Sequence, residues 1–121
     1  MDKIVIGIIE KVKIKGKKEK ELLAKVDTGA HHNSMNMKLA SELKLGPITR
    51  TAIIKNAHGK VVRPVVKATI EIKGKIIESE FNLSNREHMK YPILIGLNVL
   101  KQGFLIDPSK NYEDETSNNK S

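Results

Sequence analysis

Residues 25–30 read Lys25-Val26-Asp27-Thr28-Gly29-Ala30 and place an acid at the end of an apolar segment, Leu22–Val26. A hydroxyl residue and a glycine follow the acid at once, so the chain can turn tightly and backbone N–H groups can orient the carboxylate. An isolated Asp-Thr-Gly also forms ordinary Asx or Ser/Thr turns that only shape a loop. Taken alone, the stretch indicates either a presented carboxylate or a structural turn.

A second apolar segment, Ile93-Leu94-Ile95-Gly96, has the composition of a short buried strand that ends in glycine. A helical turn is expected next, at Leu97–Lys101, and a last strand at Phe104–Asp107. By itself this segment indicates core structure and no chemistry.

The rest of the chain has the pattern of a small, mostly β domain, because apolar residues alternate and turn residues recur at short intervals. Alternation from Ile4 onward predicts one strand that continues up to Gly16. A charged turn over Lys15–Lys20 then leads into the strand Leu22–Val26. The fold class indicated is a β-barrel or a β-sandwich.

One helix is expected, at Met37–Leu45, with Asn36 as its N-cap and Gly46-Pro47 as its stop. Further strands are expected at Arg50–Lys55, Val61–Lys73, Lys75–Leu83 and Tyr91–Ile95, with a hairpin tip over residues 56–60.

The chain of 121 residues is expected to form one domain over residues 1–108, followed by a polar tail over 109–121 that frays. The absence of cysteine excludes a disulfide scaffold, a Cys-ligated metal and a thiol nucleophile. The longest apolar run, Ile4–Ile9, is too short to span a membrane, and charge follows it too soon for a signal peptide. We therefore expect a soluble, cytoplasmic protein without membrane association.

The formal net charge is +8, and all but three of the 22 basic residues are lysines. Arginine is the usual reader of bases and phosphates, whereas lysine acts as a hydrated point charge. Two Tyr, two Phe and no Trp leave little for stacking nucleobases, so the composition argues against a nucleic-acid partner. The charge fits either a solvated lysine-rich surface or the steering of an acidic partner.

In this order and at this separation, the two apolar segments resemble the retropepsin family of aspartic proteases. That family has Asp-Thr/Ser-Gly-Ala after an early hairpin and an apolar-apolar-Gly strand before a short C-terminal helix. The sequence is most similar to the retropepsin-like subgroup that has been labelled an ATP-dependent zinc protease, and the resemblance extends over roughly residues 3–110. The matching pieces are VDTGA (26–30), RPVV (63–66), Asn85-Arg86 with Met89, PILIG (92–96) and FLIDP (104–108).

The resemblance implies a small closed acid-protease barrel with one or two short helices, and an aspartic endopeptidase that needs no cofactor. Such enzymes need two carboxylates around one water, and this chain has a single Asp-Thr-Gly. A homodimer would therefore bring Asp27 against Asp27 of a second copy, and the two would share a proton. Thr28 would lock the two turns across the pair, Gly29 would leave its carbonyl open to substrate, and Gly96 would let its strand pass close behind the turn.

The resemblance also implies which residues meet a peptide substrate. Ala30 follows the catalytic turn, and His58-Gly59 at the hairpin tip occupies the place of the family's flap. Arg63 and Arg86 lie inside the matching motifs, and either bind substrate carboxylates or act as structural braces. The subgroup's link with ATP-grasp ligases that add glutamates to proteins suggests acidic or glutamylated tails as substrates.

Two departures from the retroviral pattern concern charge and metal. Retroviral relatives have an acid after Asp-Thr-Gly-Ala that pairs with an Arg after Ile-Gly, whereas this chain has His31 and Leu97 there. Adjacent His31 and His32 would point opposite ways on an extended chain, no His-Glu-x-x-His motif is present, and the remaining histidines, His58 and His88, are far apart in sequence. We expect no metal site. The sequence also has no Gly-rich phosphate loop to support ATP dependence.

Two other functions are consistent with the same residues. A non-catalytic module on the same fold would bind a peptide or an acidic partner, and Asp27→Asn would leave its function intact. A small basic barrel that binds nucleic acid would lose affinity steeply with salt.

Overall fold

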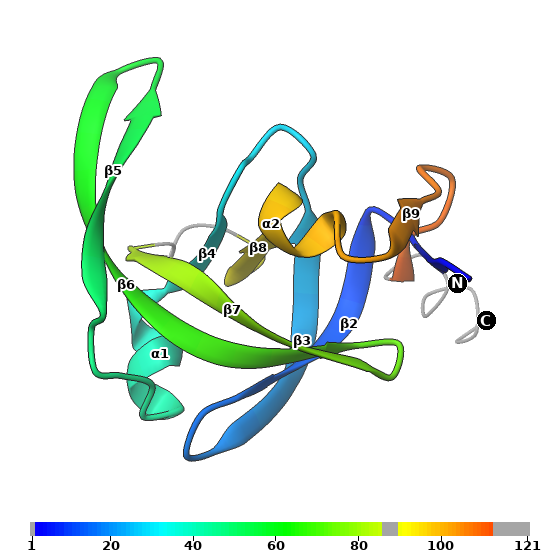
Figure 1. The fold of residues 1–121 in the computed structure, drawn as a ribbon, viewed down its shortest axis with the longest axis horizontal. Coiled ribbons are helices and arrows are strands. Elements are labelled where there is room, and N and C mark those ends of the chain that lie inside the picture. The colour runs from blue at the N-terminus through cyan, green and yellow to red at the C-terminus, as the bar shows by residue number, and fades with distance from the viewer. Residues whose placement is uncertain (1, 86–89, 113–121) are drawn as a thin grey trace.

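The structure is a computed structural model that describes residues 2–85 and 90–112 (Figure 1). Within these residues the chain forms strands and two short helices. In chain order they are β1 (Ile4–Ile6), β2 (Ile9–Lys15), β3 (Glu19–Val26), β4 (Asn33–Asn36), α1 (Met37–Glu42), β5 (Arg50–Asn56), β6 (Gly59–Ile72), β7 (Lys75–Ser84), β8 (Ile93–Ile95), α2 (Leu97–Leu100) and β9 (Phe104–Ile106).

Six strands close into a barrel. They are hydrogen-bonded in the order β2-β3-β8-β4-β7-β6, and a further pairing between β2 and β6 completes the ring. Because every strand of the ring has two neighbours, the barrel leaves no open sheet edge at these positions. The expected fold class, a small closed acid-protease barrel with two short helices, is confirmed.

The core fills the barrel because side chains alternate between its two faces. On β2, Val12 and Ile14 are buried while Lys11 and Lys15 are exposed. On β8, Ile93 and Ile95 face inward, and Leu94 between them faces outward and is half-buried. The largest fully buried side chains are Phe81, Ile6, Ile14, Met35, Ile70, Ile72, Ile93, Ile95, Val12, Val65, Val66 and Val99.

The single strand predicted from Ile4 to Gly16 is wrong, because the chain breaks at Gly7 and Ile8 into β1 and β2. A Cβ at Gly7 would lie 2.2 Å from the backbone oxygen of Lys110, so only glycine fits there. The Gly7 N–H donates to the buried carboxylate of Glu10 at 2.7 Å. β1 then pairs in parallel with β9 as a separate two-stranded sheet, a contact between distant segments that alternation cannot reveal.

Strand β4 was absent from the sequence prediction, since Asn33-Ser34-Met35-Asn36 has no apolar alternation. It exists because β7 and β8 supply partners on both sides, in parallel and antiparallel pairing respectively.

Helix α1 begins as predicted and ends earlier. The Asn36 side chain accepts a hydrogen bond from the Lys38 N–H at 2.9 Å, as an N-cap does. The helix ends at Glu42 with Leu43 as its C-cap, because Lys44 adopts a positive φ of 54° that leaves the helical region.

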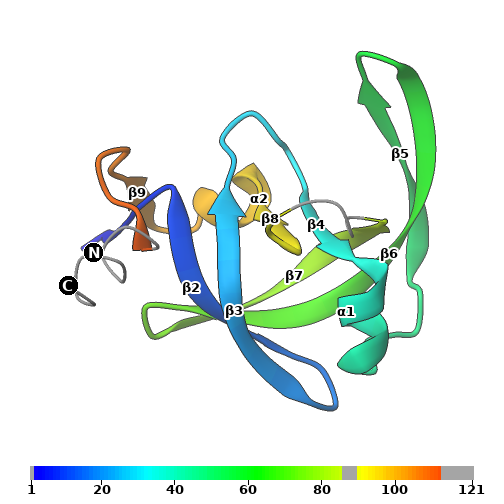
Figure 2. The ribbon, with the colours of Figure 1, turned by 180° about the vertical axis from the view of Figure 1, so that it is seen from behind.

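Strands β5 and β6 form a long hairpin whose outer half projects beyond the barrel (Figures 1 and 2). Its two-residue turn, Ala57-His58, joins the paired residues Asn56 and Gly59, and Gly59 has a φ of 124° that glycine alone adopts readily. Ile53 and Val62 are cross-strand partners on this hairpin, and both are exposed.

The described part of the C-terminal segment contacts the β1–β2 connection, where the Lys110 carbonyl accepts from the Ile8 N–H at 2.9 Å. The rest of the predicted tail, residues 113–121, lies outside the described residues. Among the helices in the described ranges, neither has the length and apolar character that a membrane crossing requires.

Candidate active site

Asp27 lies at the point where β3 leaves the barrel. Val26 is the last residue of β3 and pairs with Ile95 on β8, and the Asp27 N–H then donates to the Ile95 carbonyl at 2.9 Å. The apolar sequence of β3 buries Val26, so its neighbour Asp27 emerges on the outer face, where it is half-buried.

The turn after Asp27 holds the carboxylate in one orientation. Its Oδ1 accepts a hydrogen bond from the Gly29 N–H at 2.9 Å, and its backbone carbonyl accepts from the Ala30 N–H at 3.2 Å. Thr28 and Gly29 are exposed at the outside of this turn. The acid of the Asp-Thr-Gly stretch is therefore presented to the surface by a bonded turn.

Gly96 packs directly behind this turn. A Cβ at Gly96 would lie 2.5 Å from the His32 carbonyl oxygen and 2.8 Å from that of Ala30, so no side chain fits. The Leu97 N–H, at the start of α2, donates to the Ala30 carbonyl at 2.8 Å. These contacts attach the end of the turn to β8 and α2.

Asn33 is a residue of the site that the sequence analysis missed. Its side chain is fully buried, and its Oδ1 accepts from the Gly96 N–H at 2.9 Å. Its Nδ2 donates to the Glu80 carbonyl at 3.0 Å and to Ser79 Oγ at 3.1 Å. An amide can satisfy a donor and acceptors at once, so Asn33 joins β4, β7 and the Gly96 turn. No local pattern in the sequence marks it, because the stretch Asn33-Ser34-Met35-Asn36 is polar except for Met35.

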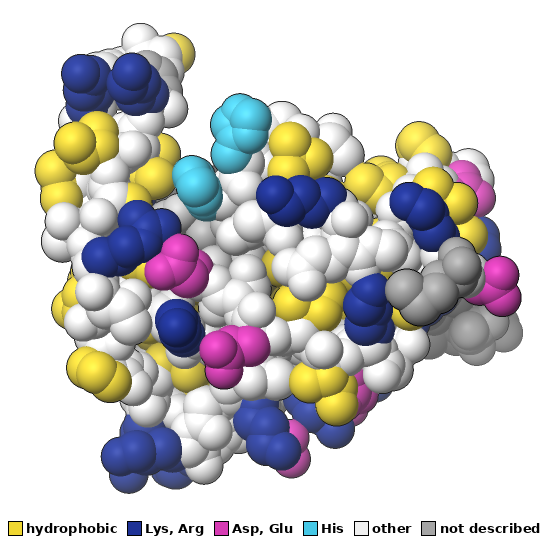
Figure 3. Space-filling model, viewed as in Figure 1, with side chains coloured by type: hydrophobic (Ala, Val, Ile, Leu, Met, Phe, Trp, Pro, Cys, Tyr) yellow, Lys and Arg dark blue, Asp and Glu magenta, His cyan; other side chains and the backbone are white. Residues whose placement is uncertain are grey.

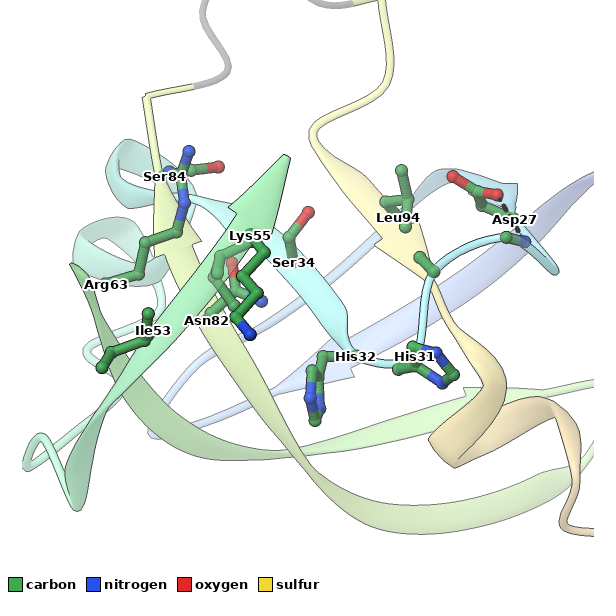
Figure 4. Close-up of a pocket in the computed structure, with 13 residues that line it drawn as sticks. Asp27, His31, His32, Ser34, Ile53, Lys55, Arg63, Asn82, Ser84 and Leu94 are labelled. Carbon is green, nitrogen blue, oxygen red and sulfur yellow. Dashed lines mark hydrogen bonds between the residues drawn. The ribbon is translucent and has the colours of Figure 1, made fainter. Parts of the chain in front are cut away.

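A cavity of about 610 Å³ lies between the Asp27 turn and the β5–β6 hairpin (Figure 4). Its floor is the outer face of the barrel, where Ser34 on β4 has Leu94 on β8 and Asn82 on β7 as its partners across the strands. Histidine side chains border the notch between hairpin and barrel in Figure 3. The lining residues are Asp27, Gly29, Ala30, His31, His32, Ser34, Ile53, Ile54, Lys55, Arg63, Asn82, Ser84 and Leu94.

The structure brings some of the predicted site residues together and separates others. Asp27, Gly29, Ala30 and Arg63 all line the cavity, although Arg63 is distant in sequence from the rest. Thr28 and Gly96 adjoin the turn without lining the cavity, and His58 and Gly59 lie at the hairpin turn beyond it. Arg86 lies outside the described residues.

His31 and His32 both line the cavity (Figure 4). The chain is bent at these two residues and not extended, so strand alternation does not apply. Within the described ranges, no three side chains of His, Cys, Asp or Glu gather as ligands of a metal ion would.

Charged side chains lie both beside the cavity and inside it. Just outside it, Arg50 on β5 donates to the Glu80 carboxylate on β7 through Nε at 3.1 Å and Nη2 at 2.8 Å. These hydrogen bonds hold the pKa of Glu80 below its usual value and raise the pKa of Arg50. Inside the cavity, Asp27 is the only acid among the described lining residues, facing Lys55 and Arg63.

Comparison with known proteins identifies the family. The sequence model of the family described as RimB-like, retropepsin-like aspartic endopeptidase RimB, matches residues 38–116, which is more than half of the chain. The chain belongs to this family. The match begins after Asp27, so the assignment to the retropepsin-like family is independent of the Asp-Thr-Gly stretch.

Solved structures share the retropepsin-like fold. A protein of unknown function from Legionella pneumophila subsp. pneumophila strain Philadelphia 1 is 23% identical with a TM-score of 0.65, covering 90% of this chain and 96% of its own. The simian foamy virus protease is 24% identical with a TM-score of 0.58, over 77% of this chain and 91% of its own. The protease of EIAV, in complex with the inhibitor HBY-793, is 21% identical with a TM-score of 0.64, over 77% and 84%.

A curated relative carries a different name. A probable alpha-L-glutamate ligase from Shewanella halifaxensis (strain HAW-EB4) is 33% identical over 60 residues. The matched segment makes up 49% of this chain and only 13% of that protein. About half of this chain is therefore similar to a small part of that much longer protein.

Proposed function

We propose that this protein is an aspartic peptidase that works as a homodimer, with Asp27 of each subunit activating water for peptide-bond hydrolysis. One observation carries the proposal. The Asp27 carboxylate lies on a hydrogen-bonded turn and lines a groove that the β5–β6 hairpin borders. The chain belongs to the retropepsin-like aspartic endopeptidase family. The cavity of about 610 Å³ is large enough for several residues of an extended peptide.

The proposal of a dimer rests on the number of carboxylates. Aspartic peptidase chemistry uses two, and Asp27 is the only acid among the described residues that line the groove. A twofold axis beside the Asp27 turn would supply the second from an identical subunit. Ionising both of two adjacent carboxylates is unfavourable because their negative charges repel, so the pair would hold one shared proton.

In this mechanism the ionised Asp27 takes a proton from the water that attacks the scissile carbonyl. The protonated Asp27 of the other copy polarises that carbonyl and stabilises the developing oxyanion. The Gly29 N–H, already bonded to Asp27 Oδ1, keeps the carboxylate aimed at the water without further rearrangement. Ala30 and the Gly29 backbone would lie against the substrate, and the hairpin with His58 and Gly59 at its turn would close over it.

Acidic or glutamylated protein tails are the substrates we propose. The chain carries a formal charge of +8, and its groove has Arg63 and Lys55 opposite a single acid. The match to part of a probable alpha-L-glutamate ligase is consistent with a substrate that such a ligase produces.

The decisive experiment compares hydrolysis by the wild-type protein and by Asp27→Asn. We expect the wild type to cleave members of a peptide library that includes poly-glutamate tails, across pH 4 to 8. Asp27→Asn should lose at least about a thousandfold in rate, because a neutral amide cannot accept the proton of water. The variant should keep the wild-type circular dichroism spectrum, since the amide oxygen still accepts from the Gly29 N–H.

Equal cleavage by both proteins would remove Asp27 from the chemistry. If neither protein cleaves any peptide while both bind acidic ones, the protein is the binding module that the same residues allow.

A further inference from the structure

Ser84, the last residue of β7, has a buried hydroxyl that lines the cavity. Its side chain is 7% exposed, and among the described residues its Oγ has no partner. A buried polar atom without a partner is costly, so it needs a reason such as a ligand. Ser84 lines the cavity that also contains Asp27, so a ligand bound there can reach it (Figure 4).

Two cations on the β5–β6 hairpin, Arg63 and Lys55, line the same cavity. In the β6·β7 ladder the last pair is Val65 with Asn82, so Arg63 and Ser84 each lie two residues further along on the same face. The Arg63 side chain extends toward Ser84 in Figure 4. Within the described ranges neither Arg63 nor Lys55 forms a hydrogen bond or an ion pair through its side chain. Arg50, by contrast, forms an ion pair with Glu80.

We propose that Ser84, Arg63 and Lys55 form a subsite for one carboxylate of a bound peptide, at the end of the groove away from Asp27. The guanidinium of Arg63 offers two parallel N–H donors to a carboxylate, the Ser84 hydroxyl donates a third hydrogen bond from the floor, and Lys55 adds charge from the hairpin. The subsite deepens the proposed peptidase function and rests on it in taking the ligand to be a peptide.

The position of this subsite sets a spacing along the substrate. Asp27 follows β3 and Ser84 ends β7, which are three strand steps apart in the order β3-β8-β4-β7. Three steps of about 4.8 Å make roughly 14 Å across the sheet. The register aligns Lys25 with Asn82 across these strands, so Ser84 is also offset from Asp27 by four residues, about 13 Å, along the strand direction. The resulting diagonal of about 20 Å is covered by about six residues of an extended peptide. The carboxylate should therefore belong to a residue about six positions from the scissile bond.

Two kinds of carboxylate have this chemistry: a glutamate or aspartate side chain, and the C-terminus of the peptide. Three decapeptides separate them. The first carries four glutamates and a C-terminal amide, the second has glutamines and a free C-terminus, and the third has glutamines and an amide. We expect the first to bind at least about tenfold more tightly than the third, as a charge-assisted hydrogen bond gives.

Binding is measured by calorimetry in the Asp27→Asn background, so that no peptide is cleaved. Arg63→Gln and Ser84→Ala should each weaken the glutamate peptide about tenfold and leave the third peptide unchanged. Lys18→Gln, in the β2–β3 turn at the far end of the barrel, removes the same charge as Arg63→Gln and should have little effect (Figure 1). Ser84→Ala should keep or raise the melting temperature, because it removes a buried hydroxyl that has no hydrogen-bond partner among the described residues.

The possible results are separable from those of the hydrolysis test. Tighter binding of either charged peptide than of the third, lost in Ser84→Ala and Arg63→Gln, supports the subsite and identifies which carboxylate it takes. Equal binding of all three peptides, or unchanged binding in both variants, overturns it even if the wild type hydrolyses peptides. An equal effect of Lys18→Gln also overturns it, because general charge would then explain the affinity.

Discussion

Gly96 and Asn33 show how single residues position the Asp27 turn from behind. Gly96 allows the carbonyls of Ala30 and His32 to approach within van der Waals distance of β8. Asn33 ties the Gly96 N–H to β7 with the other end of its amide. Glycine was recognisable in the sequence as the end of an apolar strand. The bonds of Asn33 connect residues 46 to 63 positions apart, so no local pattern contains them.

Replacing Gly96 with alanine should destabilise the fold. The new Cβ would lie 2.5 Å from a backbone oxygen that cannot rotate away, and we expect a loss of about 1–3 kcal/mol or more in unfolding free energy. Chemical denaturation measures this directly. Gly29→Ala is the matched control: its nearest contact is Asp27 Oδ1 at 3.2 Å, and its stability should stay within about 1 kcal/mol of wild type. Equal losses in the two variants would contradict the packing account.

Replacing Asn33 with alanine should cost about 2–4 kcal/mol, because the buried Gly96 N–H and Glu80 carbonyl would each lose a partner. Asn36→Ala removes an exposed helix cap and should cost only about 1 kcal/mol. Urea unfolding of both variants tests the difference, and a loss at Asn33 no greater than that at Asn36 would remove Asn33 as the link between β4, β7 and Gly96.

At the scale of elements, the β5–β6 hairpin forms one wall of the groove. Its inner half is held by β6, which belongs to the barrel, and its outer half pairs only within the hairpin in the described ranges. One further attachment is the ion pair from Arg50 at the base of β5 to Glu80 on β7. The strands and the turn of this hairpin were predictable from alternation and Gly59. That it lies across the cavity from Asp27 depends on the barrel's closure.

The Arg50–Glu80 pair predicts a pH-dependent stability. Arg50 holds the pKa of Glu80 below its unfolded value, so the stabilisation is present above that value and disappears as pH falls through the folded pKa. Arg50→Gln should lower the melting temperature slightly at pH 7, and the difference from wild type should shrink as the pH falls and Glu80 becomes protonated. Thermal melts at several pH values test this. Because the pair is exposed, 1 M salt should also shrink the difference, and a difference that does not decrease as the pH falls would contradict the ion-pair account.

At the scale of the whole molecule, the proposed chemistry needs two chains. A single subunit presents one acid in its groove among the described residues, so each productive site must combine two copies of Asp27. Exposed apolar side chains on β1 and β9, Val5 and Leu105, lie on the two-stranded sheet outside the barrel.

Mixing wild type with Asp27→Asn tests this requirement. If both copies of Asp27 are needed and subunits exchange, an equimolar mixture at fixed total concentration should keep about one quarter of the wild-type activity, as random pairing predicts. A subunit that works alone would keep about half. Analytical ultracentrifugation of the same mixture reports whether the dimer forms.

The sequence by itself determined the β-rich class, the position of the acid at a strand end, and the ordered motifs that indicated the retropepsin-like family, now shown by the family match. These features depend on residue types at short spacing, which alternation and turn chemistry express locally. Only the tertiary structure decided that the first apolar segment divides into β1 and β2 and that β1 pairs with β9. It also decided that the polar strand β4 completes the barrel, and that Ser84 and Arg63 line the same groove as Asp27. Each of these features depends on contacts between residues far apart in the chain. At such positions the neighbouring strands, and not the local sequence preference of the residues, determine the structure.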